Sequence, residues 1–163
     1  MKNILVPIDF SAASTQVVDL AALIAKAFGS EIHLIHVKEL RSIAPLGAVD
    51  YTAVGMPELM TSGLGVPIPE STPEAPPPGE AETQRLKNWQ NDLGQAGVKT
   101  TLHESNGTIV EEILKKSDEL QADLIVMGRH GHGAMYNLLV GSVTEGVLKR
   151  ATRPVLLVPG PRS

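Results

Sequence analysis

Four short, almost continuously apolar segments recur along the chain, with helical patterns between them. They are Lys2–Ile8, Glu31–Val37, Leu124–Met127 and Val155–Val158, and Lys99–Glu104 is a weaker segment of the same kind. Strands that are apolar on both faces are typical of a parallel sheet covered by helices on either side. Because crossovers between parallel strands are right-handed, we expect an α/β fold: a doubly wound five-stranded parallel sheet with helices on both faces.

A first helix is expected between the first two strands. Ser11 can cap its start, Phe28 is its last residue and Gly29 can end it. Its apolar residues recur at spacings of 4, 3 and 4, which places them on one face. The residues predicted to face the sheet are Val17, Ala21, Ile24 and Phe28.

Three further helices are predicted after residue 80. The second ends near Gly97. The third opens with a capping box, with Thr108 at the N-cap and Glu111 at N3, and continues to about Leu120. The fourth covers Gly141–Ala151. Its inward-facing residues are expected to be Val143, Val147, Leu148 and Ala151.

Proline is concentrated in one acidic segment. Eight of the twelve prolines lie between Pro45 and Pro78, and the window Arg41–Glu80 holds five acidic residues against one basic residue. Such a stretch does not form a helix or a central strand. The sequence therefore predicts one domain over residues 1–163, with a Pro-rich acidic loop insertion at about 41–79. Within it, Glu70–Gly79 is predicted to be disordered.

The composition argues against nucleic-acid-binding, disulfide-containing and membrane-spanning proteins. Fourteen basic and eighteen acidic residues give a net charge of −4, which does not favour a nucleic-acid partner. There is no cysteine, so disulfides and cysteine-ligated metals are excluded. The chain has no apolar run of about 18 residues, and its N-terminus lacks the pattern of a signal peptide. We expect a cytoplasmic protein that does not contact membranes.

The segment after the fourth strand carries the most specific signal for a ligand. Three glycines and a serine are spaced as Gly128-x2-Gly131-x9-Gly141-Ser142, a pattern that a shuffled chain of this composition contains roughly 1% of the time. Glycine lets the backbone approach a ligand closely, and the free N–H groups at a helix N-terminus attract anions. In a doubly wound sheet, ligands bind beyond the carboxyl ends of the strands. The motif therefore predicts a phosphate-binding loop at this edge.

These features resemble the universal stress protein family, and specifically its ATP-binding subclass, which carries Gly-x2-Gly-x9-Gly-(Ser or Thr) after its fourth strand. Asn3–Ser11 looks like the opening strand and Asp of the family, and Arg153–Pro159 looks like its last strand. The long segment Arg41–Gly79 departs from the family pattern. The resemblance implies a stress-response regulatory protein that binds ATP or AMP. It also implies a homodimer formed through Val155–Val158, with an unidentified regulatory protein partner.

The resemblance implies a role for each site residue. Asp9 would lie near the adenine or ribose, and Pro7 and Ile8 would line the base pocket beside it. Val37 would pack on the adenine and offer backbone hydrogen bonds. Ribose and phosphate contacts would come from Met127, Gly128, Arg129, His130, Gly131, Gly133, Gly141, Ser142, Val143 and Thr144. A divalent ion, Mg²⁺ or Mn²⁺, would be held through the phosphates rather than by a protein cage.

Several alternatives stay open at this point. Asp9 can simply cap the first helix, and His33 and His36, which lie in the second strand, can be packed or hydrogen-bonded. The chain has no P-loop, nucleophile elbow or zinc-protease motif, and no acid–base pair stands out, so binding is favoured over catalysis. The two alternative functions are a slow ATP hydrolase or other phosphoryl-transfer enzyme using the same pocket, and a nucleotide-free dimeric scaffold for protein partners.

Overall fold

The computed structural model describes residues 1–39, 79–129 and 140–160. They form, in order, β1 (Asn3–Pro7), α1 (Ser14–Phe28), β2 (Glu31–Lys38), α2 (Glu80–Gln95), β3 (Thr100–Asn106), α3 (Ile109–Glu119), β4 (Leu124–Gly128), α4 (Ser142–Arg150) and β5 (Val155–Val158). All paired strands are parallel. The predicted α/β fold with a five-stranded parallel sheet is confirmed.

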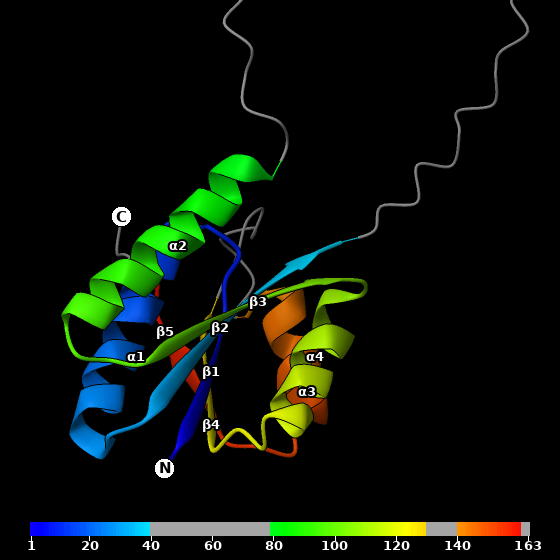
Figure 1. Cartoon of the computed structure of the whole chain (residues 1–163). Coiled ribbons are helices and arrows are strands. Elements are labelled where there is room, and N and C mark those ends of the chain that lie inside the picture. Colours follow the sequence, from blue (N-terminus) through cyan, green and yellow to red (C-terminus); the bar gives the residue numbers. More distant parts are fainter. Residues whose placement is uncertain (40–78, 130–139, 161–163) are drawn as a thin grey trace, which may run out of the picture.

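The order of the strands in the sheet is β3-β2-β1-β4-β5. The chain adds β2 and β3 on one side of β1, and then returns to add β4 and β5 on the other side (Figure 1). The direction of winding therefore changes between β1 and β4. In doubly wound sheets this switch point, beyond the carboxyl ends of the strands, is where ligands bind.

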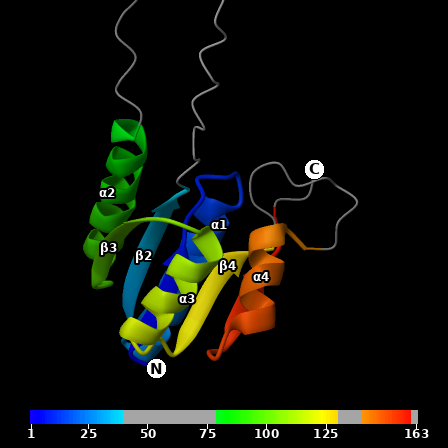
Figure 2. The same cartoon turned by 90° about the vertical axis from the view of Figure 1, so that its right-hand side faces the viewer.

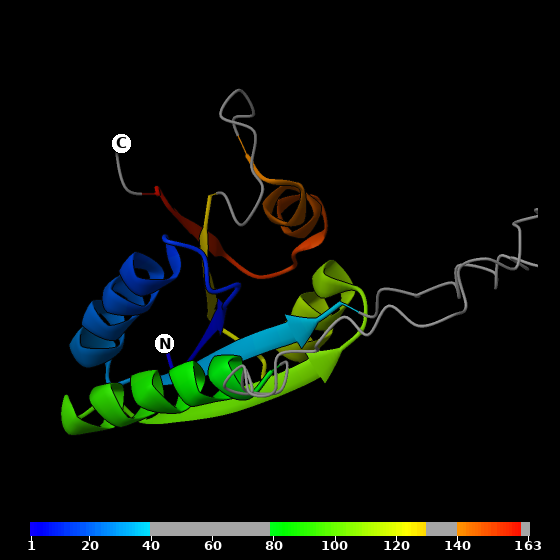
Figure 3. The ribbon, with the colours of Figure 1, turned by 90° about the horizontal axis from the view of Figure 1, so that it is seen from above.

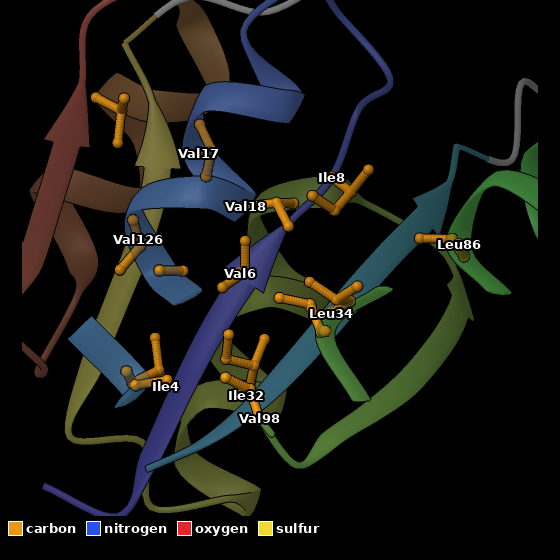
Figure 4. Close-up of a cluster of buried hydrophobic side chains, with 14 of the residues drawn as sticks. Ile4, Val6, Ile8, Val17, Val18, Ile32, Leu34, Leu86, Val98 and Val126 are labelled. Atoms are coloured by element: carbon orange, nitrogen blue, oxygen red, sulfur yellow. The ribbon is translucent and has the colours of Figure 1, made fainter. Parts of the chain in front are cut away.

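Helices cover both faces of the sheet. Seen from above, α1 and α2 lie on one side, and α3 and α4 lie on the other (Figure 3); α3 and α4 run side by side (Figure 2). Ile4 and Val6 of β1 point into the α1–α2 layer (Figure 4), whereas Leu5 between them points into the α3–α4 layer. All three side chains are fully buried, and each contributes about 1.5–3 kcal/mol by burial.

The helix α1 begins two residues later than the predicted cap at Ser11 implies. Its N-cap position is Ala13, and Ser11 lies in the preceding turn, where its carbonyl accepts the Ser14 N–H at 3.0 Å. The carboxylate atom Asp9 Oδ1 accepts the Ser11 N–H at 3.0 Å and the Ser14 hydroxyl at 2.9 Å. Asp9 therefore stabilises the turn that precedes α1, but it does not cap the helix as the alternative for this residue proposed. At the other end, Gly29 ends the helix with a left-handed φ of 64°, as predicted.

Two apolar residues that were expected to face the sheet are exposed instead. Phe28 is 61% exposed and Leu148 is 44% exposed. The last buried residue of α1 is Ala25, so the inner face ends before Phe28, the final residue of the helix. Leu148 follows the fully buried Val147 and is rotated by about 100° from it around the axis of α4. The predictions for Phe28 and Leu148 were wrong for these reasons.

The predicted capping box of α3 is not formed. Thr108 occupies the N-cap position, but its side chain makes no capping hydrogen bond. The other partner, Glu111, accepts a hydrogen bond from Arg150 of α4 at 2.9 Å. The Glu111 side chain therefore forms an ion pair with α4 and does not form the hydrogen bond of a capping box.

The predicted insertion at about 41–79 lies outside the described residues, apart from Gly79. Its extent and the disorder of Glu70–Gly79 therefore stay predictions, as does the single domain over residues 1–163. Among the helices that the structure describes, none is long and apolar enough to cross a membrane.

Candidate functional site

The turn after β1 is fixed to the neighbouring strand. Ile8 is buried, and its N–H donates to the carbonyl of Ile35 in β2 at 2.8 Å. Asp9 is exposed, and its carboxylate is oriented by the two hydrogen bonds described above. Phe10 has a φ of 59°, a left-handed conformation that a bulky residue keeps only where its surroundings hold it. Pro7, Ile8 and Asp9 therefore lie in a defined turn at the carboxyl end of β1.

Val37 directs its backbone, rather than its side chain, toward this edge. Its side chain is buried in the α3–α4 layer. The carbonyl of Ile35 faces β1, where it accepts the Ile8 N–H. Backbone groups of alternate residues in a strand point to the same side, so the N–H and C=O of Val37 point to the side of β1 as well. Val37 lies two residues beyond the last β1–β2 pair, Pro7 with Ile35, and its backbone is placed to meet the polar edge of a planar ligand.

Hydrogen bonds join the end of β4 to the start of α4. The buried Thr144 donates its hydroxyl to the carbonyl of Gly128 at 2.9 Å. The Gly141 N–H donates to the carbonyl of Arg129 at 3.0 Å, and the Arg129 N–H donates to the carbonyl of Val158 in β5 at 2.9 Å. Gly128, Arg129 and the first turn of α4 are therefore held next to one another at the carboxyl edge of the sheet.

The first turn of α4 has the features of an anion-binding helix end. Its first hydrogen bond runs from the Glu145 N–H to the carbonyl of Gly141 at 2.8 Å. The N–H groups of Ser142, Val143 and Thr144 precede this bond, and the first N–H groups of a helix have no carbonyl partner within it. Together with the helix dipole they favour a negative charge.

Two side chains of the predicted site are used inside the protein. The hydroxyl of Thr144 donates to the carbonyl of Gly128, so Thr144 can offer a ligand its N–H but not its hydroxyl proton. Met127 is buried in the α3–α4 layer, and it faces this edge only through its backbone. Arg129 and Ser142, in contrast, are exposed.

Most predicted site residues are therefore brought to one edge. Those from β1, β2, β4 and the start of α4 all follow, or adjoin, the carboxyl ends of strands in the order β2-β1-β4. His130, Gly131 and Gly133 lie outside the described residues, so their predicted roles stay predictions.

Sequence reasoning missed a cluster of side chains that holds the Asp9 turn. His36 Nδ1 lies 2.9 Å from the carbonyl oxygen of Ile8. The rings of Phe10 and Trp89 are stacked, with centroids 6.0 Å apart and an interplanar angle of 5°. The Arg85 guanidinium lies 5.0 Å from the centre of the Phe10 ring. The spacing of Glu82, Arg85 and Trp89 along α2 indicates one helix face, but nothing in the sequence indicates that this face meets the β1–α1 turn.

Two of the cavities formed by described residues lie away from the predicted site residues. One, of about 680 Å³, lies between Lys38 and the start of α2. The other, of about 510 Å³, lies near Lys2 and Lys99 at the amino edge of the sheet. Among the described residues of the candidate site, Asp9, Arg129 and Ser142 are exposed. The described part of the chain holds no group of three or more histidine or acidic side chains suited to a metal ion.

Sequence comparison places these features in a family. The model of the universal stress protein family matches residues 1–62 and 58–159. Universal stress protein MJ0531 of Methanocaldococcus jannaschii is 32% identical over 161 residues, which cover 99% of this chain and 84% of the relative. Universal stress protein MJ0577 of the same organism is 31% identical over 162 residues, with 96% and 94% covered.

Solved structures agree with the sequence matches. The structure of MJ0577 aligns with a TM-score of 0.74 at 26% identity and covers 99% of this chain and 98% of that protein. A universal stress protein in complex with cAMP has the same fold, with a TM-score of 0.63, 22% identity and 98% of both chains covered. So has a universal stress protein of Archaeoglobus fulgidus in complex with dAMP, with a TM-score of 0.58, 18% identity and 96% and 97% covered. With the family model and the relatives spanning nearly all its length, this chain belongs to the universal stress protein family.

Proposed function

We propose that this chain binds an adenine nucleotide, ATP or AMP, and acts as a cytoplasmic regulatory protein of stress response. The observation that carries the proposal is the position of the first turn of α4 beside the ends of β1 and β4, at the switch point of the sheet. A strand end and a helix start joined in this way combine oriented N–H groups with a helix dipole. That combination suits a phosphate group.

The described residues divide between the parts of a nucleotide. The turn at Ile8 and Asp9 and the backbone of Val37 are placed for the base and ribose. Exposed Arg129 and the N–H groups of the first turn of α4 are placed for the phosphates. A Mg²⁺ or Mn²⁺ ion would be held through the phosphates. Binding would change the loops around the pocket, and a protein partner would read that change.

Relatives of the same fold support the choice of ligand class. The complexes with cAMP and with dAMP each hold an adenine nucleotide. The glycine and serine spacing from Gly128 to Ser142 adds a phosphate-binding motif from the sequence itself.

The first test is mass spectrometry of the denatured, purified protein, which should release adenine nucleotide. Calorimetry with ATP and AMP then tests Ser142→Asp. A carboxylate in the first turn favours the helix but repels phosphate. We expect ATP affinity to fall at least about tenfold, which is 1.4 kcal/mol.

The matched control is Asn91→Asp, which adds the same charge at an exposed position of α2. It should keep the affinity of the unmodified chain. Unchanged ATP affinity in a folded Ser142→Asp variant contradicts the proposed site. Steady-state turnover above about one per second favours the enzyme alternative. Absence of both co-purified nucleotide and measurable binding favours the scaffold alternative.

A homodimer through β5 is the second part of the proposal. β5 is an edge strand and pairs only with β4 among the described strands. The carbonyl of Pro154 accepts the Ile125 N–H of β4, and the carbonyl of Val158 accepts the N–H of Arg129, directly after β4. Since backbone groups alternate in direction, those of Val155 and Leu157 point away from the sheet. An apolar edge strand with outward N–H and C=O groups suits pairing with a second copy about a two-fold axis.

A further inference from the structure

We propose that His36 is the positioning residue of the Asp9 turn, and that the proton on its Nε2 atom controls how firmly α2 holds this turn. The inference rests on the proposed function, because it concerns the turn that carries Asp9 to the nucleotide. The contacts that support it do not involve a ligand, so they can be tested separately.

One ring nitrogen of His36 has a fixed role. Nδ1 lies 2.9 Å from the carbonyl oxygen of Ile8, and the His36 residue is only 9% exposed. A carbonyl oxygen only accepts hydrogen bonds, so Nδ1 carries a proton in both the neutral and the charged ring. This hydrogen bond ties the turn to β2 at every pH at which the protein is folded. Gain and loss of a proton therefore take place at Nε2 alone.

The other ring nitrogen faces α2. Nε2 lies 3.4 Å from Glu82 Oε2, in the first turn of that helix. When Nε2 is protonated, the ring is an imidazolium that pairs with the carboxylate. When Nε2 is deprotonated, its lone pair faces the negative carboxylate and the attraction is lost. The link between the turn and α2 through His36 exists only in the protonated state.

The remaining contacts between the turn and α2 do not depend on this proton. The Phe10 ring lies 4.7 Å from the His36 ring, centroid to centroid, and stacks on Trp89. The Arg85 guanidinium covers both Phe10 and Trp89, at 5.0 and 5.9 Å. Phe10 keeps its left-handed backbone within this packing. Protonation of His36 therefore strengthens a contact between the Asp9 turn and α2 that already exists without the proton.

The charged groups around His36 come from four elements. Glu82 and Arg85 belong to α2, Asp9 to the turn and Lys38 to β2. Glu104 of β3 is the register partner of His36. Glu104 is already engaged by the Thr83 hydroxyl at 3.0 Å and by Lys38 Nζ at 3.5 Å. Glu82 is therefore the carboxylate that pairs with Nε2.

A turn that is held before the ligand arrives loses less freedom on binding. We therefore expect ATP to bind more tightly when His36 is protonated. Affinity should fall as the pH rises and Nε2 of His36 loses its proton. Because such coupling is reciprocal, ATP binding should be accompanied by proton uptake. Calorimetry in buffers of different ionisation enthalpy measures that uptake.

The experiment compares Glu82→Gln with Glu80→Gln. Both variants remove one charge from the first turn of α2, but only Glu82 faces His36. The unmodified chain and Glu80→Gln should bind ATP about fivefold more tightly at pH 5.5 than at pH 8, the lower end of usual coupling. Glu82→Gln should lose most of this difference. A Glu82→Gln variant that keeps the pH dependence of the unmodified chain overturns the proposal.

Two ligand-free measurements separate the positioning role from the proposed function. Nitrogen-15 spectra of the imidazole should show Nδ1 protonated throughout and Nε2 as the titrating atom; the reverse overturns the proposal. Amide exchange of Phe10 and Ser11, corrected for the intrinsic rate, should be slower at pH 5.5 in the unmodified chain but not in Glu82→Gln. If no nucleotide binds at either pH, the proposed function fails, and these two measurements still decide the role of His36.

Discussion

His33 and His103 direct their rings at one another across β2 and β3. His33 Nδ1 lies 3.2 Å from His103 Nε2, and the ring centroids are 5.4 Å apart. The register pairs Ile35 with His103, so the two histidines are diagonal neighbours on one face of the sheet. When both rings are neutral, one proton between the two nitrogens completes a hydrogen bond. When both rings are charged, both nitrogens carry a proton, so the hydrogen bond is lost and the two rings repel each other.

We expect acid to destabilise the fold through this pair. Burial lowers the pKa of His33 below its usual value, and burial together with repulsion from His33 lowers the pKa of His103. The unfolded chain therefore binds protons that the folded chain excludes, so the free energy of unfolding rises with pH. The contribution is complete above about pH 6.5 and is lost as the pH falls toward the lowered values.

Denaturant unfolding at a series of pH values measures this effect. Charged neighbours of the pair, Glu31, Lys99, Lys116 and Glu119, are unchanged in the variant His103→Gln. The variant should show a weaker loss of stability than the unmodified chain as the pH falls below about 6.5. An equally steep loss would show that other groups cause the acid sensitivity.

Gly146 allows α3 and α4 to pack closely. A Cβ at this position would lie 2.9 Å from Val110 Cγ2 of α3. We expect Gly146→Ala to destabilise the protein by about 1–3 kcal/mol, because Val110 must shift. Gly94→Ala is the matched control, since Gly94 is also helical and a Cβ there meets nothing within 4 Å. It should stabilise by about 0.5–1 kcal/mol. Thermal unfolding of the two variants should move in opposite directions.

The proposed dimer can be tested on the backbone of β5. Proline at Leu157 removes an N–H that points away from β4, and edge strands tolerate proline at such positions. Leu157→Pro should leave a folded monomer near 17.3 kDa by light scattering. Leu156→Pro removes an N–H that points toward β4 and should lower the melting temperature strongly. A dimer that persists in Leu157→Pro, or an unmodified chain that is monomeric at tens of micromolar, rules out pairing through β5.

Ser14 supports Asp9 from the first turn of α1. Its hydroxyl is buried and donates to Asp9 Oδ1 at 2.9 Å. We expect Ser14→Ala to cost about 1 kcal/mol in the free energy of unfolding and to weaken ATP binding, because the carboxylate loses one of its donors. The neighbouring Thr15→Ala, at an exposed position, is the control and should change neither quantity. Equal effects in both variants would indicate a change in helix stability only.

The fold could be predicted because a strand that is buried on both faces has a continuous apolar sequence. Leu5 and its neighbours Ile4 and Val6 are all apolar since helices cover both sides of β1. The limits of helix faces were less predictable. Phe28 fits the inner face of α1 by angle, but no pattern shows that the face ends at Ala25. Glu111 fits a capping box, and only the packing of α3 against α4 brings Arg150 within its reach.

The candidate site could be predicted where backbone and glycine spacing define it. The turn at Asp9, after β1, and the end of β4 at Gly128 follow from the predicted strand order, and the start of α4 follows from its motif. The use of Thr144 could not be predicted, because its hydroxyl meets the carbonyl of Gly128, sixteen residues earlier, only in the folded chain. His36 and Glu82 are likewise brought together by the packing of α2 on the sheet.

The amino edge of the sheet is fastened by its own set of hydrogen bonds. The Asp123 carboxylate accepts the N–H groups of Lys2 and Asn3, and the Ser30 hydroxyl donates to the carbonyl of Met1. Every candidate nucleotide contact in the described part of the chain lies at the opposite edge. The proposed nucleotide contacts are therefore separated, by the length of the strands, from the hydrogen bonds that hold the start of the chain. Substitutions at the proposed site can accumulate in evolution without loss of those hydrogen bonds.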